Sequence, residues 1–293
     1  MERHPYLLLA IATLCSGVAP VLVRYTGMDA SAIAFWRLAL TLPAAWLLIR
    51  RLPPLPRRDV GLALLAGVML ALDLVLWFGA IRRTTMLEAT LLVMLYPLLV
   101  AAAAVIWEGQ KLGLSLVGGF ALCFAGMVAM SGITPSAGSD AVGNGMALAA
   151  AAAYAVCFML LARLSRQHNV MLVTFWLLVG ASIGALPAAL VFSTTFLPPT
   201  GADWGLLAVQ AALSLASYNA SNLAFRRLPT ALAAVTGYGQ PIIATGIAWI
   251  AFAERPGLMA VTGAVVIALG VWLTSRPGPA RTAPASAAGG TAE

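Results

Sequence analysis

The second half of this chain repeats the first at a spacing of 144 residues. The repeat pairs identical residues, namely Arg82-Arg83 with Arg226-Arg227, Pro97 with Pro241, Gly113 with Gly257, Gly119 with Gly263, and Gly126 with Gly270. Each half contains five long apolar segments. Because five is odd, the second half must enter a membrane from the side opposite to the first. Many secondary transporters build two alternating gates around one central site from such an inverted repeat.

Composition excludes a soluble protein. Hydrophobic residues make up 61% of the chain and charged residues 9%, whereas a soluble domain carries about 25% charge. The net charge of +7 comes from basic residues in short loops between apolar segments. That layout is typical of the positive-inside rule and not of a phosphate-binding face, so nucleic acid is excluded as a partner and the lipid bilayer is expected.

The apolar segments predict an all-α integral membrane protein of ten transmembrane helices arranged as an inverted 5+5 repeat. A helical span needs roughly 20 mainly apolar residues, and strand alternation is absent. The predicted spans are 6–24, 30–49, 59–80, 85–106, 113–131, 143–163, 170–192, 203–225, 231–252 and 257–274. The first repeat covers 6–131, the second covers 143–274, and 275–293 form a disordered cytoplasmic tail rich in Pro, Gly, Ala and Ser.

Lys and Arg predict the orientation. With a cytoplasmic N-terminus, twelve basic residues lie inside and four outside, with Arg37 within a span. Arg82 and Arg83 are exceptions, because their repeat mates lie on the other side. We therefore expect both termini in the cytoplasm of a bacterium and the helices in its inner membrane.

Enzyme and metal functions find little support in the sequence. The three cysteines, Cys15, Cys123 and Cys157, fall within spans without metal-ligand spacing, so we interpret them as small membrane residues and predict no metal or cofactor. His4 and His168 lie in termini or loops, and no metalloprotease or Ser/His arrangement is visible. A sensor or assembly factor with a transporter fold stays an alternative to transport.

Several stretches resemble the drug/metabolite transporter superfamily, specifically bacterial proteins with two EamA domains. They are AFWRLAL around Arg37, WFGAIRRTTMLEATLLVMLYPLLVAAAAVIWEGQKL, its counterpart LAFRRLPTALAAVTGYGQPIIATGIAWIAFAERPGL, and VTGAVVIALGVWL. Glu108 and Glu254 take the acidic place near the end of each small-residue helix. The resemblance implies that helices 1, 3, 4, 6, 8 and 9 line a central cavity. It also implies export of a small-molecule solute, with amino acids as the nearest group, and uptake of a vitamin or efflux of toxic cations as alternatives.

Three ionisable residues fall within spans. Arg37 and Asp73 each lie about seven residues from the outer end of their helix, roughly 10 Å deep at 1.5 Å per residue. Glu88 is shallower, one turn into its helix. Charges at membrane depth usually face a cavity or pair with each other. Arg37 could hold a carboxylate while Asp73 or Glu88 titrates, or Arg37 and Asp73 could form a structural ion pair.

Polar residues form a stripe on the span 203–225, with Ser214, Ser217 and Ser221 at helical spacing beside Tyr218 and Asn222. Ser217 is the repeat mate of Asp73. This face either lines the cavity or packs on another helix through its small residues.

Pro97 and Pro241 lie in mid-span at equivalent places and predict two symmetry-related kinks that could serve as gates, the alternative being static bends. Tyr96 and Gln240 precede them and could offer polar groups to the solute. Candidate cavity aromatics are Trp77, Phe78 and Tyr238, although each could serve only packing or lipid contact.

The glycine-rich stretches VGGFALCFAG and TGAVVIALG predict close helix packing, with a symmetric dimer contact as the lesser alternative, so the protein is a monomer or a homodimer. No Walker A pattern is present. We therefore expect the solute gradient or protons, rather than direct ATP hydrolysis, to drive transport.

Overall fold

The computed structural model describes residues 5–23, 25–84, 86–109, 113–131, 140–252 and 257–275. These residues form helices and no strands, so the all-α prediction is confirmed for this part of the chain. The helices are α1 (Pro5–Val23), α2 (Ala30–Ala39), α3 (Thr41–Ile49), α4 (Arg57–Ile81), α5 (Met86–Val93), α6 (Tyr96–Glu108), α7 (Leu114–Ser131), α8 (Ala141–Gln167), α9 (Val170–Phe192), α10 (Gly201–Phe225), α11 (Thr230–Val235), the 3₁₀ turn η1 (Thr236–Tyr238), α12 (Gly239–Phe252) and α13 (Leu258–Ser275). Glu254 and the predicted tail beyond Ser275 lie outside the described residues.

Length and composition identify membrane-spanning candidates. Five described stretches are long and apolar enough to cross a membrane, namely Ala30–Ile49, Arg57–Ile81, Glu88–Glu108, Ala141–Gln167 and Val170–Phe192. Three shorter apolar helices are Pro5–Val18, Leu114–Met130 and Leu258–Thr274. The full count of ten crossings stays a prediction.

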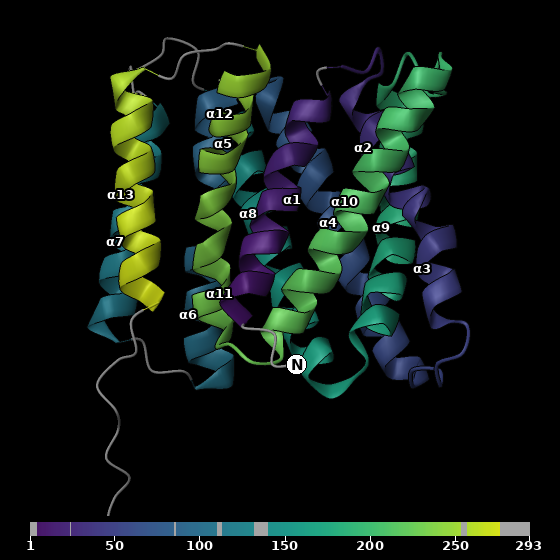
Figure 1. Cartoon of the computed structure of the whole chain (residues 1–293), viewed down its shortest axis with the longest axis horizontal. Helices are drawn as coiled ribbons and strands as arrows, with labels where there is room; N and C mark the ends of the chain where they lie inside the picture. Colours follow the sequence, from purple (N-terminus) through teal and green to yellow (C-terminus); the bar gives the residue numbers. More distant parts are fainter. Residues whose placement is uncertain are drawn as a thin grey trace, which may run out of the picture.

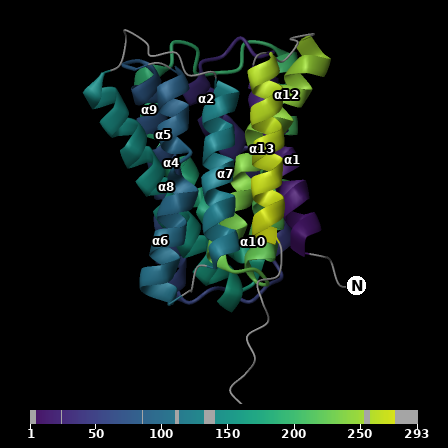
Figure 2. The ribbon, with the colours of Figure 1, turned by 90° about the vertical axis from the view of Figure 1, so that its left-hand side faces the viewer.

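Successive apolar spans run alternately up and down in one bundle, and the pairs α2 and α3, α5 and α6, and α11 and α12 each continue in one direction (Figures 1 and 2). We call the end that holds Pro5, Glu108 and Phe225 the lower end, and the end that holds Ile81 and Ala141 the upper end, as drawn in Figure 1.

Three of the predicted spans are broken, and each break precedes a proline. Helix α2 ends at Ala39, four residues before Pro43, and α5 ends at Val93, four residues before Pro97. The turn η1 contains Gly237, four residues before Pro241. Proline lacks the N–H that would bond this carbonyl, and its ring crowds the same oxygen. The two predicted kinks therefore correspond to real interruptions. Pro187 differs, because α9 continues through it.

Helices α7 and α13 pack along each other at one edge of the bundle (Figure 2). Glycines bring the two backbones together: a Cβ added at Gly126 would lie 2.7 Å from the Gly263 carbonyl oxygen, and one at Gly270 would lie 2.8 Å from the Gly119 oxygen. The sulfur of Cys123 donates to the Ile267 oxygen at 3.6 Å. The predicted packing role of these glycines is confirmed within the chain.

Gly263→Ala is expected to destabilise the protein by about 1–3 kcal/mol, the usual cost of overpacking. The added methyl would lie 2.5 Å from the Gly126 oxygen and would collide with the Met130 backbone nitrogen. Thermal unfolding in detergent measures the effect. Gly246→Ala is the matched control, because a Cβ there meets nothing within 4 Å and helix propensity changes equally. Equal unfolding temperatures for the two variants would contradict the packing role.

A clamp at the upper end orients α2. The Asp29 carboxylate accepts hydrogen bonds from the Thr194 nitrogen (2.7 Å), the Thr194 hydroxyl (2.8 Å) and the Thr195 nitrogen (3.0 Å). The indole nitrogen of Trp36 donates to the Phe196 oxygen at 2.8 Å. These bonds hold α2 against the connection between α9 and α10, and the last turn of α2 carries Arg37.

The clamp predicts a loss of stability in acid. Hydrogen bonds from Thr195 and Thr194 lower the pKa of Asp29 below its ordinary value. A lowered pKa in the folded state stabilises the protein above the unfolded pKa, near 4, and this contribution disappears as the pH falls through the folded pKa. Unfolding temperatures measured from pH 6 down to pH 3 should fall less steeply in Asp29→Asn than in the parent. Parallel curves for the two proteins would show that Asp29 makes no pH-dependent contribution to stability.

Candidate functional site

A cavity of about 290 Å³ lies inside the bundle. Its wall takes residues from α1, α4, α5, α6, α8, α10 and α11 with η1 and α12, and one residue from α2. The family resemblance implied these spans except the second, which enters the wall through Arg37.

Seven of the predicted site residues line this cavity: Arg37, Asp73, Trp77, Tyr96, Ser217, Tyr218 and Gln240. Five do not: Phe78, Glu88, Tyr238, Pro97 and Pro241. Glu88 accepts a hydrogen bond from the Thr84 hydroxyl at 2.5 Å at the start of α5. Phe78 packs on Trp77 with ring centroids 5.3 Å apart, and Tyr238 is fully buried in an apolar cluster formed by α6, α7, α11 and α13.

Opposite charges face the cavity without pairing. Arg37 and Asp73 both line it, yet no ion pair within 4.0 Å joins them among the described residues. Asp73 is only 8% exposed, and its Oδ1 and the Arg37 Nε lack a hydrogen-bond partner in the described protein. Buried polar atoms are costly when unpaired. The alternative of an ion pair that locks two helices is therefore absent from this conformation, and both residues line the cavity with unused hydrogen-bonding capacity.

Two more unpartnered polar atoms belong to cavity residues. The Trp77 Nε1 is a donor and the Asn222 Oδ1 is an acceptor. The Asn222 Nδ2 donates to the Thr174 hydroxyl on α9 at 3.0 Å, which fixes the orientation of the amide. Four residues that line the cavity therefore hold unused hydrogen-bonding capacity: donors on Arg37 and Trp77, and acceptors on Asp73 and Asn222.

The polar stripe on α10 both lines the cavity and packs on another helix, the two alternatives that the sequence left open. Ser217 bonds to the Ser16 hydroxyl at 2.7 Å and donates to the Ala12 oxygen at 3.0 Å, which ties α10 to α1. Ser214 and Ser221 also line the cavity, and no bond from them to another helix is recorded in the described structure.

Aromatic rings form much of the remaining wall. Tyr96 meets Tyr154 edge to face with centroids 4.5 Å apart, and Phe158 packs on Phe225 at 4.6 Å. Tyr154, Phe158 and Cys157 belong to α8 and were not predicted. The alanine-rich stretch that carries them shows no polar periodicity from which their direction could be deduced.

Two of the three broken spans, α5–α6 and α11–α12, meet the cavity at their breaks. The cavity is lined at these breaks by Val93 and Gly237, beside Tyr96 and Gln240. The carbonyls of Val93 and Gly237 have no helical N–H donor, because the residues four positions later are Pro97 and Pro241. The Tyr96 hydroxyl lies directly against Gly237. Interrupted helices around a central site are typical of secondary transporters.

Comparisons with known proteins agree with this architecture. The EamA-like transporter family matches residues 4–132 and 141–276. The chain is 27% identical over 274 residues to proteins named pseudopaline exporter CntI from two strains of Pseudomonas aeruginosa, covering 92% of this chain and 95% of theirs. A solved crystal structure that is 20% identical superposes with a TM-score of 0.75 over 92% of this chain and 97% of the other, which shows a shared fold. The chain is therefore a multi-pass membrane protein that belongs to the EamA-like transporter family of the drug/metabolite transporter superfamily.

Proposed function

We propose that this protein is a secondary transporter that exports amino acids, or small solutes derived from them, across the bacterial inner membrane by alternating access. In this proposal the chain crosses the membrane ten times as an inverted 5+5 repeat, with the lower end and both termini in the cytoplasm. The repeats 6–131 and 143–274 enclose the site between them. The protein acts as a monomer or homodimer and needs no cofactor.

One observation carries the choice of solute: an unpaired arginine and an unpaired aspartate face the same cavity. The guanidinium of Arg37 suits a carboxylate, because its planar donors match carboxylate geometry. The carboxylate of Asp73 suits an ammonium group. A solute that carries both groups, as every amino acid does, would satisfy both side chains and remove the cost of leaving them unpaired.

The family and the named relatives support the direction. Two relatives are named as exporters of pseudopaline. A cavity of about 290 Å³ is of a size that suits a small organic solute. Binding and release on the two sides would follow from movements of the broken helices.

Counterflow in proteoliposomes tests the proposal. Vesicles loaded with unlabelled solute are diluted into a labelled panel of amino acids, pseudopaline, riboflavin and a quaternary ammonium cation. Accumulation of an amino acid or pseudopaline above protein-free vesicles would support it. Movement of riboflavin or the quaternary cation alone would replace the proposed solute with a vitamin or a toxic cation.

A further inference from the structure

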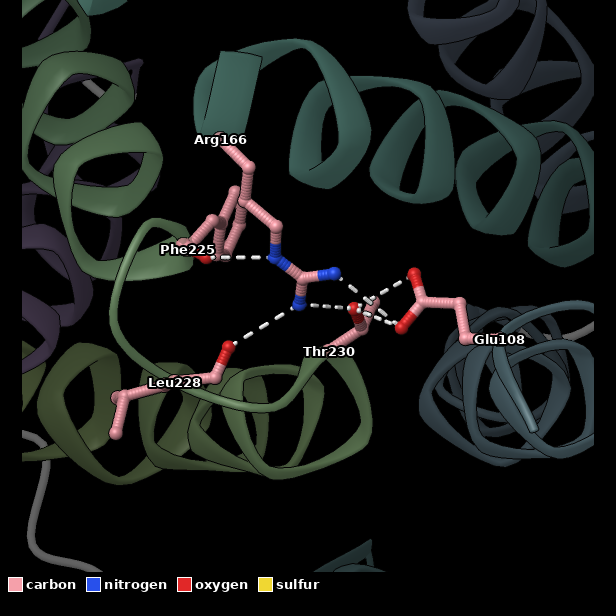
Figure 3. Close-up of polar contacts among 5 residues, drawn as sticks. All are labelled: Glu108, Arg166, Phe225, Leu228 and Thr230. Carbon is pink, nitrogen blue, oxygen red and sulfur yellow. Dashed lines mark hydrogen bonds and ion pairs between the residues drawn. The ribbon is translucent and has the colours of Figure 1, made fainter. Parts of the chain in front are cut away.

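Three side chains, Glu108, Arg166 and Thr230, contact one another at the lower ends of α6, α8 and α11 (Figure 3). Arg166, in the last turn of α8, donates from Nε to the Phe225 oxygen at 3.1 Å and from Nη2 to the Leu228 oxygen at 3.2 Å. The same Nη2 donates to the Thr230 hydroxyl at 2.8 Å, and Nη1 lies 3.4 Å from the Glu108 carboxylate. One guanidinium therefore binds the end of α10, the connection to α11, the start of α11 and the end of α6.

Thr230 completes the network. Its hydroxyl accepts from Arg166 and lies 3.0 Å and 2.9 Å from the two Glu108 oxygens, to which it can donate its proton. Thr230 is fully buried, whereas the side chains of Arg166 and Glu108 are 32% and 21% exposed. We call Glu108, Arg166 and Thr230 the lower latch.

The latch lies under the floor of the cavity. Phe225, whose carbonyl Arg166 holds, lines the cavity and packs on Phe158, which also lines it. A solute moving toward the lower end would have to part these rings, and the bonds beneath them resist that movement.

The elements that the latch joins are also built to move separately. Helices α6 and α11 contact each other, and each is divided from the rest of its span by a break. The break before Pro97 and the turn η1 before Pro241 both meet the cavity. Each lower half-helix can therefore tilt about its break while α5 and α12 keep their places.

Partial exposure makes the latch reversible. Separating a fully buried ion pair would leave charges in a dry interior at great cost. Here water can reach Arg166 and Glu108 as they part, so opening replaces protein bonds with hydration. A rotation of Arg166 would release α8 from the ends of α6 and α10 and from the start of α11, while the Thr230–Glu108 bonds would still join α11 to α6.

We propose that the lower latch is the gate of the transport cycle on the lower side: it holds the cavity closed there, and its release opens the cavity toward that side. This inference rests on the proposed transport function. Glu254, the acidic residue near the end of the corresponding helix of the second repeat, lies outside the described residues.

Labelling of a native cysteine tests the gate without knowledge of the solute. Cys15 is half-buried on α1 and lines the cavity. A membrane-impermeant maleimide is applied to right-side-out and to inverted membrane vesicles, and modification of Cys15 is quantified by mass spectrometry. Arg58→Cys, at an exposed position of the lower end, reports which vesicles present that end.

Thr230→Val, which keeps the shape but removes the hydroxyl, and Arg166→Gln should raise labelling of Cys15 from the lower side roughly tenfold, because each charge-assisted bond shifts the open population by about that factor. Labelling from the upper side should fall at the same time. Thr230→Ser, which keeps the hydroxyl, and Arg163→Gln, an exposed charge change on the same helix, should behave like the parent.

A latch that only holds the fold together would give a different result. Labelling would then stay unchanged, or rise equally from both sides as the protein loosened, and either result overturns the gate. Failure of counterflow with a normal labelling response would instead reject the solute proposal and leave the gate standing.

Discussion

Asp73→Asn is expected to reduce counterflow of amine-bearing solutes by roughly 10- to 100-fold, since a hydrogen bond to a charged group contributes about 1.5–3 kcal/mol. Asparagine keeps the size of the side chain but cannot balance an ammonium charge. A solute with a carboxylate and no amine should be affected much less. Arg37→Gln should show the reverse preference, because it removes the partner of the carboxylate.

The ratio between two solutes in one variant is the decisive measurement, because partial misfolding lowers both rates together. Asp59→Asn is the matched control: it makes the same chemical change on the same helix, where Asp59 pairs with His168 at 2.9 Å outside the cavity. If Asp73 also carries the coupled proton, flux in Asp73→Asn will stop responding to an imposed pH gradient. An unchanged solute preference would remove Asp73 from the binding site.

The placement of the charges shows how far sequence reasoning reaches. Counting residues from the ends of two spans placed Arg37 and Asp73 at one depth, and both line the cavity. Depth alone cannot say whether two side chains touch, because that depends on how their helices are rotated and separated. The sequence therefore could not decide between an ion pair and two free partners.

The lower latch escaped prediction for a related reason. Arg166 and Glu108 stand at the ends of apolar segments, where charged residues are expected at any membrane surface. Only the packing of α6, α8 and α11 brings them to the same threonine. The repeated glycines and prolines, in contrast, correctly indicated close helix packing at α7 and α13 and interruptions at Pro97 and Pro241, because small residues and proline act on the backbone directly. The partner of each glycine-rich helix and the break before Pro43 were not predicted.

Gly237→Ala is expected to abolish most transport. The methyl would overlap the Tyr96 hydroxyl, so the two broken helices could no longer meet at their breaks. Overpacking costs about 1–3 kcal/mol, and here the cost falls on the segment that must change shape during each cycle.

Adding Tyr96→Phe should restore much of the lost activity, because it removes the oxygen that the methyl strikes and leaves the ring carbon 3.0 Å away as the nearest atom. Counterflow rates of Gly237→Ala and of the double variant, each divided by the amount of folded protein, measure the recovery. Gly246→Ala is the control, since a methyl on this later part of the same span meets nothing within 4 Å. A double variant as inactive as Gly237→Ala would show that the defect comes from the backbone of η1 and not from the contact between the two broken helices.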